Sequence, residues 1–182
     1  MSETVEWLYE RVLVLRCQAG DEAAFEEIVR RHHDRLRYYV QKMIGRGEAE
    51  DVLQEVWLDV FRSIPRLREV GAFKNWLYRI ARDRVFRRLR QERSPISLNE
   101  ASVEPSAPEN GEFSEEDAAR IHAALDDLSP EHREVLVLRF LEEMDYEQIA
   151  GVIGEPVGTV RSRLHYAKRA LRCAIERMND HG

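Results

Sequence analysis

The strongest constraint on the fold is the spacing of apolar residues, which is helical in two parts of the chain and is lost in the stretch between them, residues 94–118. Apolar residues recur at intervals of three and four before residue 94 and again after residue 118, which is the pattern of helices that bury one face. We predict helices at about 5–17, 21–44, 49–64 and 72–92, and then at 121–128, 130–140, 146–153 and from 156 onward. No segment alternates as a half-buried strand does. The predicted fold class is therefore all-α, with two small helical domains.

The stretch between the two helical halves has a different composition. Residues 94–118 contain seven acidic residues and no basic one, and three prolines interrupt them. Such a composition is typical of a flexible and extended connection. We therefore predict domains at 1–93 and 119–182, joined by a flexible acidic linker at 94–118.

Charge is unevenly distributed along the chain, although the net charge is −6. Residues 62–93 contain 11 basic and 3 acidic residues, and residues 156–177 contain 6 basic residues and 1 acidic residue. One basic helix is most simply a solvated face. Two of them, separated by acidic stretches, favour contact with nucleic acid at two places.

Several classes of protein are disfavoured. Cys17 and Cys173 are the only cysteines, which excludes a disulfide framework and a cysteine-rich zinc site and suits the reducing cytosol. No apolar run approaches the length of a membrane-spanning helix, and the first residues lack the basic region of a secretory signal. No phosphate-binding glycine loop, HExxH sequence or nucleophile elbow is present. We expect a cytoplasmic protein without an integral membrane segment that is not an enzyme and needs no cofactor or metal.

Residues 146–163 have the pattern of a helix-turn-helix. Ala150 is small where two helices would cross, and Gly154 permits the tight turn four residues later. Ile149 and Val160 supply packing between the helices. The second helix is rich in arginine, and a helix in this position can enter the major groove of DNA. An ordinary helical hairpin with a basic surface is the alternative.

Longer strings within both halves resemble a known family. Residues 128–136 (LSPEHREVL), 146–150 (YEQIA) and 156–165 (PVGTVRSRLH) closely resemble region four of the extracytoplasmic-function (ECF) sigma factors, which belong to the sigma-70 family. Residues 20–25 (GDEAAF), 49–56 (AEDVLQEV) and 73–82 (FKNWLYRIAR) resemble region two of the same family, in the expected order. The resemblance implies a region 2 bundle and a region 4 helix-turn-helix in a factor that binds core RNA polymerase, recognises promoter elements and helps to melt promoter DNA.

The resemblance also implies roles for particular residues. The polymerase-binding residues are expected to be Asp51, Val52, Leu53, Gln54 and Glu55. Asp51, Gln54 and Glu55 share one side of a helix because they stand at i, i+3 and i+4. Recognition and melting of the minus-ten element are expected to use Arg66, Arg68, Phe73, Lys74, Trp76, Arg79, Arg82, Arg84, Arg87 and Arg88. Helical spacing makes Trp76 more typical of a core residue than of a stacking platform. Asp83 stands where the family often has asparagine.

The recognition helix is expected to read the minus-thirty-five element. The residues assigned to it are Thr159, Arg161, Ser162, Arg163, His165, Tyr166, Lys168 and Arg169. Arg161, Ser162 and His165 are placed to face base edges, whereas Arg163, Lys168 and Arg169 suit phosphate contacts. Glu155 and Tyr166 depart from the residues common in relatives, so promoter specificity is expected to differ.

Two other classes of protein remain as alternatives. A conventional helix-turn-helix regulator would bind an operator without polymerase, and a helical adaptor would bind two protein partners. A dimerisation helix or an effector domain would favour the regulator, and neither is visible in the sequence. The expected partners are bacterial core RNA polymerase, promoter DNA and, from the resemblance alone, an anti-sigma factor.

Overall fold

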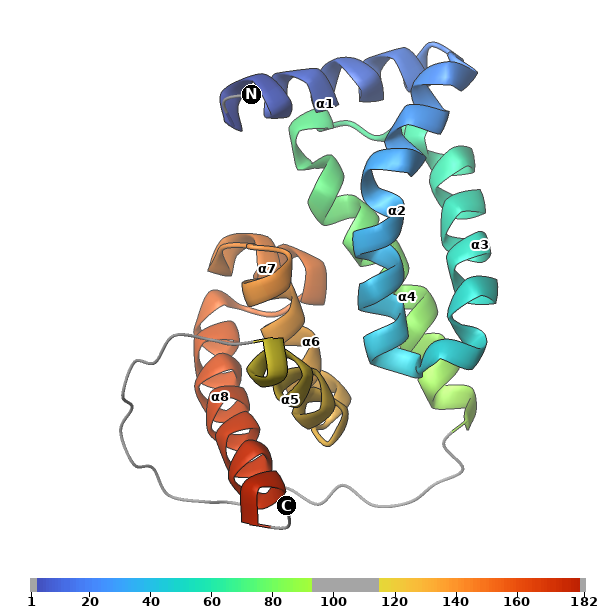
Figure 1. Cartoon of the computed structure of the whole chain (residues 1–182). Helices are drawn as coiled ribbons and strands as arrows, with labels where there is room; N and C mark the ends of the chain where they lie inside the picture. The colour runs from blue at the N-terminus through green and yellow to red at the C-terminus, as the bar shows by residue number, and fades with distance from the viewer. Residues whose placement is uncertain (1–2, 93–114, 181–182) are drawn as a thin grey trace.

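The computed structural model describes residues 3–92 and 115–180, and every regular element in these ranges is helical (Figure 1). This confirms the all-α prediction. The first half contains α1 (Glu3–Gln18), α2 (Glu22–Ile44), α3 (Arg46–Ser63) and α4 (Phe73–Glu92), with the short 3₁₀ turns Ile64–Arg66 and Val70–Ala72 before α4. The second half contains α5 (Glu115–Asp126), α6 (Pro130–Leu136), a π-helical turn (Val137–Leu141), α7 (Tyr146–Ile153) and α8 (Val157–Asp180). No described helix has the length and apolar composition needed to cross a membrane.

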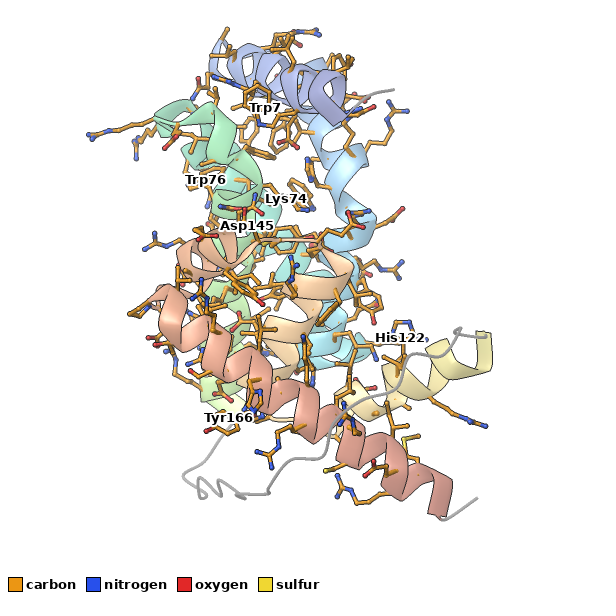
Figure 2. All side chains as sticks on the ribbon, turned by 90° about the vertical axis from the view of Figure 1, so that its left-hand side faces the viewer. Trp7, Lys74, Trp76, His122, Asp145 and Tyr166 are labelled. Carbon is orange, nitrogen blue, oxygen red and sulfur yellow. The ribbon has the colours of Figure 1, made fainter. Side chains whose placement is uncertain are left out.

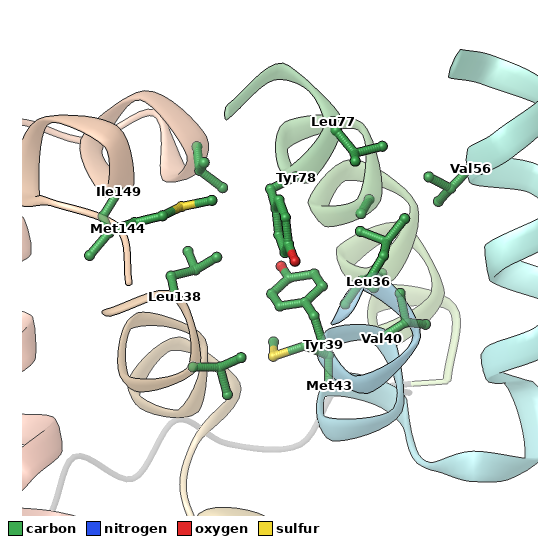
Figure 3. Packing of buried hydrophobic residues seen from close by; sticks show 14 of the residues in the cluster. Leu36, Tyr39, Val40, Met43, Val56, Leu77, Tyr78, Leu138, Met144 and Ile149 are labelled. Carbon is green, nitrogen blue, oxygen red and sulfur yellow. The ribbon is translucent and has the colours of Figure 1, made fainter. Parts of the chain in front are cut away.

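Local sequence signals set the ends of the helices in the first half. The Asp21 carboxylate accepts a hydrogen bond of 3.1 Å from the backbone N–H of Ala24 and so caps α2. Gly45, with φ of +83°, ends α2 and lets α3 begin at once in a new direction. Helices α2, α3 and α4 then bury Leu36, Val56 and Leu77 against one another (Figure 3).

The second half differs from the prediction at two places. Helix α5 begins at Glu115, inside the predicted linker. The predicted boundary was too late because residues 115–117 are acidic, like the rest of the linker, although acidic residues also favour the start of a helix. The rest of the predicted linker lies outside the described residues. The predicted helix over 130–140 is α-helical only to Leu136. A π-helical turn follows, in which the Glu142 N–H donates to the Val137 carbonyl over 3.1 Å.

The two halves pack directly against each other. Helix α4 contacts α7, and α2 contacts α6. The rings of Tyr39 and Tyr78, 5.4 Å apart, face Leu138, Met144 and Ile149 of the second half across the boundary (Figure 3). All five residues are fully or almost fully buried. The sequence predicted two domains on a tether, and the described residues add a shared apolar contact between them.

Candidate nucleic-acid interface

The expected polymerase-binding stretch covers two faces of α3. Asp51, Gln54 and Glu55 are exposed, as their spacing predicted. Val52 and Leu53 are 6% and 1% exposed and belong to the core, and their assignment as polymerase contacts stays a prediction. Five consecutive residues cannot share one side of a helix with 3.6 residues per turn. The consecutive part of the motif therefore combines an exposed polar face with the apolar residues that hold it in place.

Two exposed apolar residues extend this face, and sequence reasoning missed both. Leu58 is 51% exposed and stands one and two turns beyond Gln54 and Asp51 on the same side of α3. Phe61 is 53% exposed, and its ring lies 5.1 Å from that of Phe25. The exposure of Leu58 could have been predicted from the sequence, because it stands seven residues, or two helical turns, after the exposed Asp51. An exposed apolar patch rimmed by polar residues is typical of a surface that a protein partner covers, whereas a single exposed apolar residue is not.

Two of the arginines assigned to the minus-ten element instead connect α4 to α3. Arg84 pairs with Glu55 through Nη1 over 2.6 Å, and its Nε donates to Asp59 Oδ2 over 2.6 Å. The hydrogen bond with Asp59, followed by the attraction of both carboxylates, raises the pKa of Arg84. Arg88 pairs with Glu48 in the same way, one turn further along. Both cations therefore align α3 and α4 in this arrangement.

Other members of the minus-ten set are distributed between the surface and the core. Phe73 is fully buried, 5.4 Å from the His32 ring and 5.9 Å from the Trp76 ring, and its assignment to the minus-ten set stays a prediction. Trp76 is half-buried against the core, which agrees with its helical spacing. The exposed cations are Arg66, Arg68, Arg79 and Arg87. These four arginines and the half-buried Trp76 are the part of the set that is accessible to DNA in this arrangement.

The remaining two cations of the set, Lys74 and Arg82, turn toward the second half of the chain. Arg82 Nε lies 3.0 Å from Oε1 of Glu134, and Lys74 Nζ donates to the Glu142 carbonyl over 2.6 Å. Burial raises the pKa of Glu134 to about 7, while Arg82 and the Tyr39 hydroxyl act in the opposite direction. Sequence reasoning missed Glu134. Its position could have been recognised, because it stands one helical turn before Leu138, where the apolar spacing predicts a residue that faces the core.

The helix-turn-helix forms as its residues predicted. Asp145 and Gln148 make a reciprocal capping box at the start of α7. Gly154 ends α7 with φ of +72°, a left-handed conformation that suits glycine. Ile149 and Val160 are fully buried between the helices. The turn therefore presents α8 with one face against α7 and the other in solvent.

The exposed face of α8 carries most of the residues assigned to the minus-thirty-five element. Arg161, Ser162, His165, Tyr166 and Lys168 are exposed, and Figure 2 shows Tyr166 projecting from the outer side of the helix. The other three members of the set, Thr159, Arg163 and Arg169, are half-buried.

Of the two half-buried arginines, Arg163 contacts Glu155, the residue that departs from those common in relatives. Arg163 Nη2 lies 3.8 Å from the Glu155 carboxylate, so this unusual glutamate faces a residue assigned to phosphate contact. One Nη atom of Arg169 is buried without a hydrogen-bond partner among the described residues. No group of three or more potential metal ligands occurs within residues 3–92 and 115–180.

Comparison with family models assigns both halves of the chain. Residues 28–94 match Sigma-70 region 2, and residues 118–171 match Sigma-70 region 4. The two matches contain the exposed polar face of α3, the cationic helix α4 and the helix-turn-helix. They follow each other in the order predicted from the sequence.

Whole-chain relatives agree with the two family models. The ECF RNA polymerase sigma-E factor of Escherichia coli is 34% identical over 91% of this chain and 94% of its own length. ECF RNA polymerase sigma factor SigE of Mycolicibacterium smegmatis is 37% identical over 84% of this chain, which spans 63% of that relative's length. The sigma factor RpoE of Bartonella quintana, solved with the anti-sigma factor NepR, superposes with a TM-score of 0.65 at 21% identity, over 84% of this chain and 96% of that one. The chain belongs to the ECF RNA polymerase sigma factors of the sigma-70 family.

Proposed function

We propose that this protein binds bacterial core RNA polymerase and directs it to promoters by recognising a minus-thirty-five and a minus-ten element. The observation that carries the proposal is the pair of cationic helices, α4 and α8, on two separate halves of one chain. A factor that reads two promoter elements needs two such surfaces and a third that attaches it to polymerase. It acts as a regulatory subunit and catalyses no step itself.

Each surface has a separate role in this proposal. The exposed face of α3, with Asp51, Gln54 and Leu58, docks on polymerase. The exposed arginines of α4 hold the backbone of the melted strand at the minus-ten element, where cations along a groove suit single-stranded DNA. Helix α8 enters the major groove, where Arg161 and Ser162 contact base edges and Lys168 contacts a phosphate.

Run-off transcription with core polymerase on a library of genomic fragments tests the proposal. Transcripts that appear only when the chain is present support it, and their start sites then define both promoter elements. The Arg161→Ala variant serves as the matched control for promoter recognition. It removes one proposed base contact on α8 and leaves the proposed docking face of α3 unchanged. Fragments that are bound without any chain-dependent transcript would identify a conventional helix-turn-helix regulator instead.

An anti-sigma factor is the second proposed partner. Support comes from the Bartonella quintana relative, which was solved in complex with the anti-sigma factor NepR. We expect a protein that sequesters this chain in the cytoplasm and blocks its access to polymerase. Co-purification from the source cells, followed by inhibition of run-off transcription with the purified partner, tests this expectation. A partner that co-purifies without inhibiting transcription would contradict it.

A further inference from the structure

An exposed tryptophan of α1 lies beside the loop of residues 64–72 that leads into α4. Trp7 is 50% exposed, and a Cβ atom added at Gly71 of the loop would lie 3.9 Å from Cζ2 of its indole ring. Figure 2 shows Trp7 on the side of α1 that faces α4. Trp7 precedes residues 28–94, the part of the chain that matches Sigma-70 region 2. An indole ring that is half in solvent offers a large flat surface for a partner molecule to cover.

Contacts at both ends of α1 hold this helix along the loop. Near the end of α1, the Gln18 side chain donates hydrogen bonds to the carbonyls of Ile64 and Leu67, over 3.1 Å and 2.7 Å. Near its beginning, Trp7 lies next to Gly71. Two hydrogen bonds from one side chain fix the loop backbone at two carbonyl groups. Helix and loop therefore form one continuous surface.

The Trp7 ring carries a cation and is otherwise poorly covered. The guanidinium carbon of Arg11, one helical turn further along α1, lies over the ring at 4.4 Å from its centroid. Gly71 meets the ring near Cζ2 and has no side chain with which to cover it. The exposure of Trp7 therefore leaves part of the ring open to solvent. An open aromatic surface beside a cation suits an unpaired base, which stacks on the ring while the cation attracts its phosphate.

The loop adds two cations close to this ring. Arg66 and Arg68 precede Gly71 in the loop, and both are exposed. Neither of them, nor Arg11, forms an ion pair with another residue in the described ranges 3–92 and 115–180. All three guanidinium groups are therefore available to phosphates, which are the groups that position a nucleic acid on a protein.

The aromatic residues assigned to the minus-ten set offer less ring surface than Trp7 does. Phe73 is 0% exposed, and Trp76 is partly buried against the core. Proteins that hold single-stranded DNA combine a cationic surface with aromatic rings on which bases stack. The minus-ten set supplies the cations, and Trp7 supplies an exposed ring beside them.

We propose that Trp7 and Arg11 form a stacking site for one unpaired base of the melted promoter strand, in which the Trp7 ring stacks on the base and Arg11 attracts the neighbouring phosphate. The inference rests on the proposed function, because it needs single-stranded promoter DNA beside the loop of residues 64–72. The ligand is a nucleobase of any kind, since every base has a flat π surface. The site therefore adds affinity for the melted strand without selecting one base.

Binding of a forked promoter fragment by the chain in complex with core polymerase tests the inference. The fragment comes from a promoter that gives chain-dependent transcripts, and its non-template strand is left unpaired across the minus-ten region. The Trp7→Leu variant keeps an apolar contact with the loop but has no flat ring. It should bind the fragment at least about 5-fold more weakly than the wild type, which is the lower end of what stacking of one base contributes. Trp7→Phe, which keeps a ring, should recover most of this loss.

Tyr9 provides a matched control on the same helix. It is 40% exposed and has the Arg31 guanidinium over its ring at 4.7 Å, so it resembles Trp7 in both respects. Two residues of an α-helix are about 200° apart around its axis, so Tyr9 points away from the side of α1 that meets the loop. Tyr9→Leu should bind the forked fragment as the wild type does. An equal loss in Tyr9→Leu and Trp7→Leu would contradict the inference.

Abasic sites locate the stacked base and separate stacking from a structural role. Each position of the unpaired strand is replaced in turn by an abasic sugar, which keeps the phosphate and removes the base. At the stacked position the wild type should lose as much affinity as Trp7→Leu loses on the intact fragment, and Trp7→Leu should lose nothing further. A structural role for Trp7 would lower affinity by the same factor at every position, and that result would overturn the inference.

The remaining outcomes distinguish the inference from the proposed function. Unchanged affinity of Trp7→Leu for the forked fragment would overturn the inference and leave the proposed function in place. Weaker binding of Trp7→Leu to core polymerase without DNA would assign the ring to a protein contact and would also overturn it. A wild-type chain that supports no transcription from any fragment would overturn the proposed function and the inference with it.

Discussion

Glu134 is buried where the two halves pack together, and its carboxyl should make this closed form of the chain less stable as the pH rises. Burial raises its pKa from 4.5 to about 7, and the lowering effects of Arg82, the Tyr39 hydroxyl and Arg163 do not cancel this rise. The unfolded chain loses this proton near pH 4.5, whereas the closed chain keeps it until about pH 7. Between these values the closed chain binds more protons, so its stability falls with pH. The contribution of Glu134 to stability is therefore fully present below pH 4.5 and is lost as the pH rises through about 7.

The size of the effect follows from the shift in pKa. One pKa unit corresponds to about 1.36 kcal/mol, so ionising Glu134 in the closed chain costs roughly 3 kcal/mol. This is a large fraction of the stability of a small domain. The Glu134→Gln variant keeps an acceptor for Tyr39 and removes the charge. It should lie within about 1 kcal/mol of the wild type near pH 5 and be more stable than the wild type at pH 8, by up to roughly 3 kcal/mol.

Urea unfolding of both proteins at pH 5 and pH 8, followed by circular dichroism, measures this difference. Subtracting the two proteins at each pH removes the contribution of every other titrating group. Glu147→Gln, at an exposed position of the same half, is the matched control and should follow the wild type at both pH values. A Glu134→Gln variant that is less stable than the wild type at pH 8 would refute the reasoning. It would mean that the attraction of Arg82 exceeds the cost of burial.

Three further predictions concern the exposed surfaces and the turn. Leu58→Glu and Asp51→Lys should each weaken binding to core polymerase in a competition assay while circular dichroism stays unchanged, and unaltered affinity of both would remove this face of α3 from the interface. Arg161→Ala should cost about 1–3 kcal/mol at one promoter position, whereas Lys168→Ala should weaken all sequences alike and reduce the salt slope by about 0.9; identical profiles across a promoter library would contradict these roles. Gly154→Ala should lower stability by about 1 kcal/mol in thermal unfolding, since the φ of +72° disfavours a Cβ atom although nothing lies within 4 Å of it; an unchanged melting temperature would contradict this.

The sequence by itself determined the helices and most of their ends. Asp21, Ser129 and Gly154 end or begin helices through interactions with backbone groups three or four residues away, and these depend on the local chain alone. Helical spacing likewise predicted that Asp51 is exposed and that Val160 is buried. The family and the order of its two regions could also be predicted from local strings of residues.

Only the tertiary structure decided which charged residues meet. Arg84 and Arg82 stand two positions apart on α4, yet one pairs with α3 and the other with Glu134 of the second half. Nothing in the local sequence distinguishes them, because a pairing partner 29 or 52 positions away is chosen by how the helices pack. The burial of Glu134 has the same origin, since its environment comes from α2, α4 and α8 together. Charge and helical period are local properties, whereas burial and ion pairing depend on contacts between distant segments.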